Sequence, residues 1–114
     1  MKEYTLQFIN PIFRQGYNTT CRLGSKHYLA LLKYTRKCKN KGITPYLRLK
    51  DITGKQEDLV CELVSLSCVS EFLDVGQEAV SSNYVYRTYV DLWQGMKEAY
   101  EGFTHKNAVT VIGF

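Results

Sequence analysis

Alternating polar and apolar positions predict strands at both ends of the chain. Residues 3–9 (EYTLQFI) place Tyr4, Leu6 and Phe8 on one side and polar side chains on the other. This period of two is typical of a half-buried strand. Residues 107–114 (NAVTVIGF) also predict a strand, with Val109, Val111 and Gly113 on one face and Thr110, Ile112 and Phe114 on the other. We therefore expect a first and a last strand at the two ends of the chain.

Three further segments favour extended structure. Residues 18–23 (NTTCRL) contain threonines, whose branched Cβ favours strands, and residues 44–51 (TPYLRLKD) alternate. Residues 59–72 (LVCELVSLSCVSEF) predict one long apolar strand, with a bend at Ser65 or Ser67 left open. A turn around Thr53 and Gly54 precedes this last strand.

Helical spacing appears in the last third of the chain. Apolar side chains recur along residues 86–101 at positions Tyr89, Leu92, Trp93, Met96 and Tyr100. Such a stripe is more often core than a base-stacking platform, so we expect Trp93 to be largely buried.

Two other segments have helical features. Residues 10–16 (NPIFRQG) predict a short helix, with Asn10 as its cap, Pro11 in its first position and Gly16 at its end. Residues 27–42 are ambiguous between a helix and a short strand followed by a basic loop.

This order of elements predicts a single α+β domain over residues 1–114. We expect a curled, mostly antiparallel sheet that contains the first strand, the strand starting at residue 59 and the last strand. The 86–101 helix should pack at its side or end.

Composition narrows the class of protein. Apolar residues make up 45% and charged residues 23% of the chain, as in ordinary globular domains. No apolar run approaches the ~18 residues that span a bilayer, and no signal peptide is recognisable, so we expect a cytoplasmic protein without a membrane partner. The four cysteines form no C-x-x-C pair, so we expect no metal and no cofactor. Cys61 and Cys68, which stand among Leu and Val, are predicted to be small core residues.

Charge is distributed unevenly along the chain. Residues 1–55 hold twelve Lys or Arg and two acids, which gives +10, whereas residues 56–114 hold three and nine, which gives −6. No acid occurs from Tyr4 to Lys50. Such a basic half is typical of proteins that bind phosphate-rich partners, although it could also be a solvated face.

Residues 16–26 (GYNTTCRLGSK) combine hydroxyls, an amide and cations without a carboxylate. An arginine can hold a phosphate or carboxylate through two parallel hydrogen bonds. The stretch therefore indicates an anion site built from Asn18, Thr19, Thr20, Arg22 and Lys26. The alternatives are strand propensity for the threonines, and an ion pair of Arg22 with Glu78 or Glu62.

The order of motifs resembles the ASCH domains of the PUA-like superfamily. A helix ending at Gly16 precedes Thr20 and Arg22, Phe72 precedes the acidic helix start GQEAV with Glu78, and the chain closes with a helix ending at Tyr100 and a strand ending at Phe114. The resemblance implies a PUA-like curled β-barrel with a short N-terminal helix and a longer helix before the last strand.

The resemblance also implies chemistry. Some ASCH proteins hydrolyse N4-acetylcytidine with Thr, Lys and Glu. Thr20 matches the threonine, Asn18 stands nearest to the position of the lysine, and Ser82 or Asn83 stands where the glutamate would lie, one turn after Glu78. A threonine hydroxyl needs a base to become nucleophilic, so we expect binding in preference to catalysis.

Three hypotheses follow. The first is an RNA- or nucleotide-binding domain, in which Asn18, Thr19, Thr20, Arg22, Lys26 and Glu78 hold the ligand. In it the nucleic-acid backbone lies on Lys33, Arg36, Lys37, Lys39, Lys41 and Arg48. The second is an amidohydrolase acting on an acylated nucleoside, with Thr20 as the catalytic residue. The third is an interaction module for an acidic protein. The sequence leaves the oligomeric state open.

Overall fold

The computed structural model describes residues 2–114 and confirms the α+β class. The described elements are, in chain order, β1 (Tyr4–Phe8), β2 (Thr19–Leu23), α1 (Lys26–Asn40), β3 (Tyr46–Asp51), β4 (Leu59–Glu62), β5 (Ser65–Val69), a 3-10 turn (Phe72–Asp74), α2 (Gln77–Ser81), α3 (Tyr89–Ala99) and β6 (Val109–Gly113). The strands expected at the two ends, at 18–23 and at 44–51 are present.

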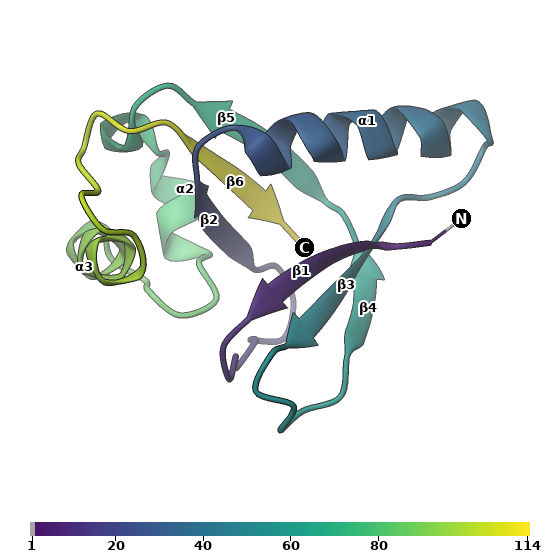
Figure 1. Ribbon diagram of the computed structural model, residues 1–114, viewed down its shortest axis with the longest axis horizontal. Coiled ribbons are helices and arrows are strands. Elements are labelled where there is room, and N and C mark those ends of the chain that lie inside the picture. The colour runs from purple at the N-terminus through teal and green to yellow at the C-terminus, as the bar shows by residue number, and fades with distance from the viewer. Residues whose placement is uncertain (1) are drawn as a thin grey trace.

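The described strands form two three-stranded sheets, in the orders β1-β3-β4 and β2-β6-β5 (Figure 1). β1 pairs with β3 in parallel, and the other pairs are antiparallel. The prediction that the first and last strands share one curled sheet is therefore wrong, and no closed barrel forms among residues 2–114. Local periodicity identifies strands, but their partners depend on contacts far apart in sequence.

The long strand predicted over residues 59–72 is two strands in different sheets. The N–H of Leu63 donates to Pro45 O at 3.0 Å, beside the first sheet, and the N–H of Val64 donates to Gly113 O at 2.8 Å, in the second. The chain therefore crosses between the sheets at this dipeptide. Cys61 and Cys68, expected in the core, lie half-buried on either side of the crossing.

The short helix predicted over residues 10–16 does not form. Asn10 has φ +45° and donates its N–H to Asp51 Oδ1 at 3.0 Å. The N–H of Arg14 donates to Asn18 Oδ1 at 3.1 Å, where a helix would direct it to residue 10. Tertiary hydrogen bonds thus replace the helical ones, although Gly16 does adopt a left-handed conformation at φ +93°.

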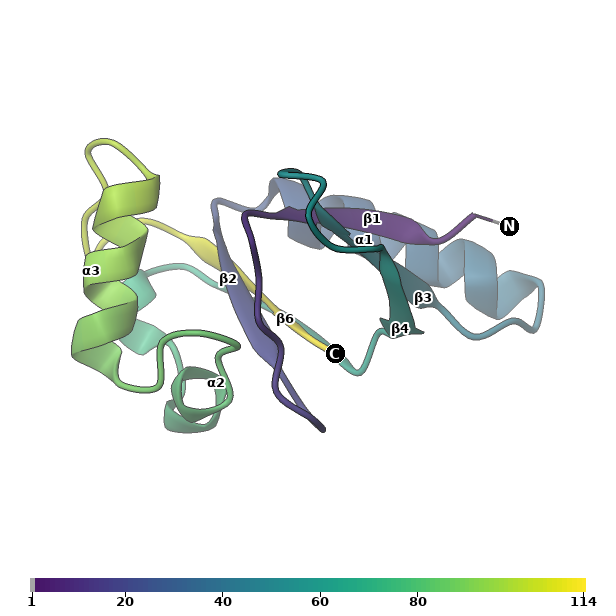
Figure 2. The same cartoon turned by 90° about the horizontal axis from the view of Figure 1, so that it is seen from below.

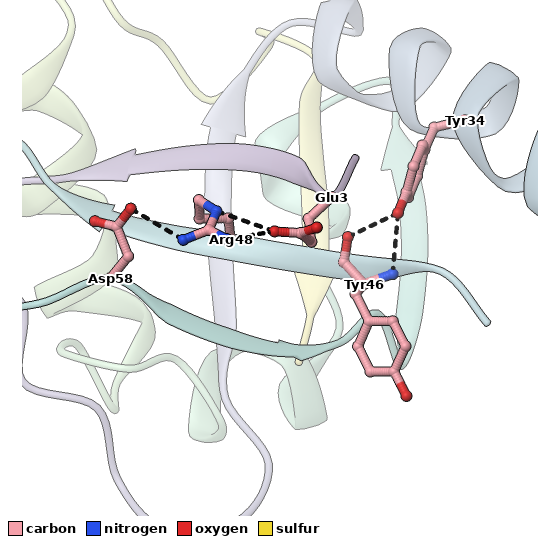
Figure 3. Close-up of polar contacts among 5 residues, drawn as sticks. All are labelled: Glu3, Tyr34, Tyr46, Arg48 and Asp58. Carbon is pink, nitrogen blue, oxygen red and sulfur yellow. Dashed lines mark hydrogen bonds and ion pairs between the residues drawn. The ribbon is translucent and has the colours of Figure 1, made fainter. Parts of the chain in front are cut away.

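The ambiguous segment 27–42 is helical and forms most of α1. Leu31 and Cys38 are buried beneath it, against the side of the second sheet that holds β5 and β6. Tyr34 ties the helix to β3, because its hydroxyl donates to Tyr46 O at 3.0 Å and accepts from Tyr46 N at 3.1 Å (Figure 3).

Helices α2 and α3 cover the opposite end of the second sheet (Figure 2). Trp93 on α3 is partly buried and packs against the core around Phe72, in keeping with the apolar stripe expected on this helix. Its ring stacks on His105 at a centroid distance of 3.7 Å, and Lys97 Nζ lies 5.3 Å from the centroid of the Trp93 ring.

Among residues 2–114, no helix is long and apolar enough to cross a membrane.

Candidate functional site

A cavity of about 450 Å³ opens between β2, the segment 83–86 and α3. Its walls come from four parts of the chain and combine aromatic rings with few polar groups. The lining residues are Ile9, Asn10, Thr20, Cys21, Arg22, Asn83, Tyr84, Val85, Tyr86, Leu92, Gly95, Met96, Ala99 and Tyr100. Three tyrosines and one arginine in a concave site can hold a flat, anionic molecule.

Arg22 is held by three contacts at the edge of this cavity. Its Nε donates to Thr20 Oγ1 at 3.3 Å, and its Nη2 donates to Gln7 O at 2.8 Å. The guanidinium carbon lies 4.7 Å from the centroid of the Phe8 ring, within cation–π range. These contacts fix the plane of the guanidinium before any ligand arrives.

The charge of Arg22 is not neutralised by a carboxylate. Both ion pairs found among residues 2–114 belong to Arg48, so the ion pair considered between Arg22 and Glu78 or Glu62 does not form. Burial lowers the pKa of the guanidinium, and the neighbouring phenols of Tyr100 and Tyr84 act in the opposite direction. Arginine stays protonated in proteins, so the cavity carries a positive charge whose Nη1 has no partner in the described chain.

Thr20 and Cys21 supply the small polar groups of the β2 wall. Thr20 is 3% exposed, and its hydroxyl oxygen accepts from Arg22. Burial raises the pKa of the Cys21 thiol to about 12. Cys21 is therefore a neutral thiol at physiological pH and no candidate nucleophile.

The segment that carries Asn83 is fixed to β2 and to Arg14. The N–H of Thr19 donates to Ser82 O at 2.9 Å, and the N–H of Tyr84 donates to Thr19 O at 3.0 Å. Arg14 Nη2 donates to the carbonyls of Ser81 and Asn83 at 2.7 and 3.0 Å. This wall of the cavity is thus held by backbone hydrogen bonds to β2 and by the side chain of Arg14.

Asn18 and Thr19, both expected to bind ligand, are engaged in the fold. Asn18 Nδ2 donates to the carbonyls of Arg14 and Gly16, at 2.9 and 3.2 Å. Thr19 Oγ1 donates to Ala79 O at 2.6 Å. Both residues are buried, and neither lines the cavity. Their hydrogen bonds therefore hold neighbouring segments in place and do not face a ligand in the cavity.

Lys26 and Glu78 lie outside the cavity lining. Lys26 is exposed at the start of α1, and Glu78 is exposed on α2. In the first turn of α1, burial lowers the pKa of His27, and the charges of Arg22 and Lys26 lower it further. His27 Nδ1 is hydrogen-bonded to Tyr4 Oη at 2.8 Å.

The residues expected to contact a nucleic-acid backbone fall into two groups. One group is exposed along α1 and just beyond its end, and consists of Lys33, Arg36, Lys37, Lys39 and Lys41. The other is Arg48 on β3, which is paired with Glu3 at 2.6 Å and with Asp58 at 3.3 Å (Figure 3). Arg48 is thus occupied by acids, whereas no acid lies on α1.

Sequence reasoning did not assign Asn83, Tyr84 or Tyr86 to the ligand site. Their sequence, SSNYVYR, has no distinct periodicity and is typical of a loop. One feature pointed to them: Gly95 interrupts the apolar stripe of α3, and the Tyr86 ring occupies the space that a side chain there would take. A glycine inside a helix often marks such a close approach.

Comparison of the chain with protein-family models, curated proteins and solved structures found no match. Among residues 2–114, no cluster of three or more His, Cys, Asp or Glu could hold a metal ion.

Proposed function

We propose that the protein is an ASCH-like, PUA-like domain that binds RNA or a nucleotide. The base enters the cavity, and the phosphate contacts Arg22. The observation that carries this proposal is the partly buried, carboxylate-free guanidinium of Arg22 in a cavity walled by Tyr84, Tyr86 and Tyr100. Aromatic rings stack on nucleobases, and each such stack is worth about 1–3 kcal/mol.

The basic helix supports RNA over a free nucleotide. Lys26, Lys33 and Lys37 lie within about 40° of one another around α1, with Arg36 beside them, because 3.6 residues make one turn. We call these four exposed residues the basic face of α1. The helix starts three residues after β2 and extends away from α3 (Figure 1). A strand whose base occupies the cavity can therefore continue along this face.

The hydrolase hypothesis has one supporting observation, since the Thr20 hydroxyl lines the cavity. The lining residues include no Lys, His or carboxylate that could take its proton. A positioned general base contributes about a hundredfold to ten-thousandfold in rate. We therefore expect no hydrolysis of N4-acetylcytidine above background. Turnover that is lost in Thr20→Val would instead make the protein an enzyme.

The test of the binding function is an equilibrium panel. Fluorescence anisotropy would compare a short single-stranded RNA, single-stranded DNA, duplex DNA and an acidic peptide of equal charge, and calorimetry would cover the nucleoside monophosphates. We expect RNA or a nucleotide to bind more tightly than the peptide. Equal or tighter binding of the peptide would favour the protein-interaction hypothesis, and no binding of any nucleic acid or nucleotide would refute the proposal.

A further inference from the structure

Asn83 is the most deeply buried polar side chain that lines the cavity, at 2% exposed. Its Oδ1 accepts from the N–H of Val85 at 3.0 Å and from the N–H of Tyr86 at 2.9 Å. Two backbone donors can only meet an oxygen, so the orientation of the carboxamide is determined. The Nδ2 group must then be the atom on the other branch.

Asn83 Nδ2 donates to no protein atom among residues 2–114. Every hydrogen bond of this side chain within the described chain uses Oδ1. The fully buried side-chain nitrogen and oxygen atoms without a partner in the described chain are Arg14 Nε and Asp51 Oδ2, so Asn83 Nδ2 is accessible from the cavity and can donate to a ligand or water there. The segment around Asn83 is held by Thr19 and Arg14, so the amide cannot turn away easily.

We propose that Asn83 Nδ2 reads the base, by donating to an acceptor on its ring edge. This inference rests on the proposed nucleotide function. Both lone-pair positions of Oδ1 are used by backbone donors, so Asn83 offers donors only. The Thr20 hydroxyl hydrogen adds a second donor to the same cavity, while Arg22 Nη1 is left for the phosphate. The cavity therefore selects a base edge on which a carbonyl oxygen lies beside a ring-nitrogen acceptor, as in cytosine or guanine.

The test exchanges one atom of Asn83. Asn83→Asp keeps an oxygen for the two backbone donors and replaces the ligand-facing donor by an acceptor. Calorimetry would first show which of CMP and GMP binds the wild type more tightly. It would then compare the affinity for that nucleotide with the affinity for ribose 5-phosphate, in the wild type and in the variant. All three probes carry the same phosphate, so the new charge acts on each, and the ratio of affinities isolates the base. We expect the ratio to fall at least about tenfold, because a buried donor–acceptor pair becomes an acceptor–acceptor pair.

Asn107→Asp is the matched control, since Asn107 Oδ1 also accepts from a backbone N–H, that of Thr104 at 2.7 Å, and Asn107 does not line the cavity. It should leave the ratio unchanged. Should Asn83→Asp misfold, the side-chain amide resonance of Asn83 in the wild type should still shift with the nucleotide and not with ribose 5-phosphate.

The outcomes separate the two proposals. Three results would each overturn the role of Asn83, even where RNA still binds. They are an unchanged affinity ratio in Asn83→Asp, an Asn83 amide resonance that does not shift with the nucleotide, and binding of CMP and GMP that is no tighter than that of ribose 5-phosphate. If no nucleotide and no RNA binds the wild type, the proposed function fails and this inference fails with it.

Discussion

The ring of Tyr86 packs directly on the backbone of α3 at Gly95, in the space where any larger residue would place its Cβ. Glycine inside a helix costs about 1 kcal/mol relative to alanine. The chain tolerates this cost at the one helical position where the ring needs the space. Gly95 thereby sets the distance between Tyr86 and the opposite wall of the cavity, which β2 provides.

Gly95→Ala should weaken nucleotide or RNA binding while changing stability little. The added methyl displaces the Tyr86 ring, which is the flexible partner, and the gain in helix propensity of about 1 kcal/mol offsets the poorer packing. Binding titrations and urea unfolding would measure the two effects separately.

The control is Gly76→Ala, because a Cβ at Gly76 meets nothing within 4 Å and the residue lies outside the cavity. Its affinity should equal that of the wild type. If Gly95→Ala also binds normally, Tyr86 does not form part of the binding site.

Reversing the charge of Lys33 and Lys37 should weaken RNA binding and flatten its salt dependence. Each lysine that no longer neutralises a phosphate of a single strand reduces the slope of log affinity against log salt by about 0.7. Since bonds to phosphate carry no base information, all RNA sequences should weaken alike. Affinity measured over a salt series gives this slope.

A matched pair of reversals at Lys55 and Lys106 changes the net charge equally, away from α1, at exposed positions. If this pair reduces affinity as much as the pair on α1, overall charge rather than the basic face of α1 attracts RNA.

Stability should fall on mild acidification because of His27. Burial, followed by Arg22 and Lys26, holds the pKa of His27 below its ordinary 6.5. Below pH 6.5 the unfolded chain takes up a proton that the folded protein rejects, so the free energy of unfolding decreases as pH falls towards the folded pKa. His27→Gln removes this titration, and Gln can still hydrogen-bond Tyr4.

Urea unfolding at pH 7.5 and pH 5.5 would measure the effect in both proteins. If the free energy of unfolding falls between pH 7.5 and pH 5.5 as much in His27→Gln as in the wild type, groups other than His27 cause the acid sensitivity.

The sequence predicts β1, β2, β3 and β6 well because their pattern is local. It predicts α3 for the same reason, since Leu92 and Met96 are buried as expected. By contrast, it predicts one strand over residues 59–72 where the structure has two, because the crossing at Leu63 and Val64 depends on partners in two sheets. The 10–16 segment contradicts its local pattern because Asp51, 41 residues away, and Asn18 take the backbone donors that a helix would use.

The candidate site was predictable only in part. Thr20 and Arg22 stood out, because a cation beside hydroxyls is visible in one stretch of sequence. Asn83, Tyr84 and Tyr86 were not, because they reach the cavity through a loop whose position depends on hydrogen bonds with Thr19 and Arg14. The charge of Arg48 likewise gave no sign that Glu3, 45 residues away, would pair with it.

The most direct test of the cavity as the binding site is a calorimetric titration of Arg22→Lys with the tightest-binding RNA or nucleotide. Lysine keeps the positive charge but lacks the planar guanidinium group. In the wild type this group donates hydrogen bonds to Thr20 and Gln7 and lies over the Phe8 ring. We expect affinity to fall about tenfold or more, by the loss of a charged hydrogen bond. Arg48→Lys, outside the cavity, should bind as the wild type does. Equal affinities for Arg22→Lys and the wild type would contradict the account.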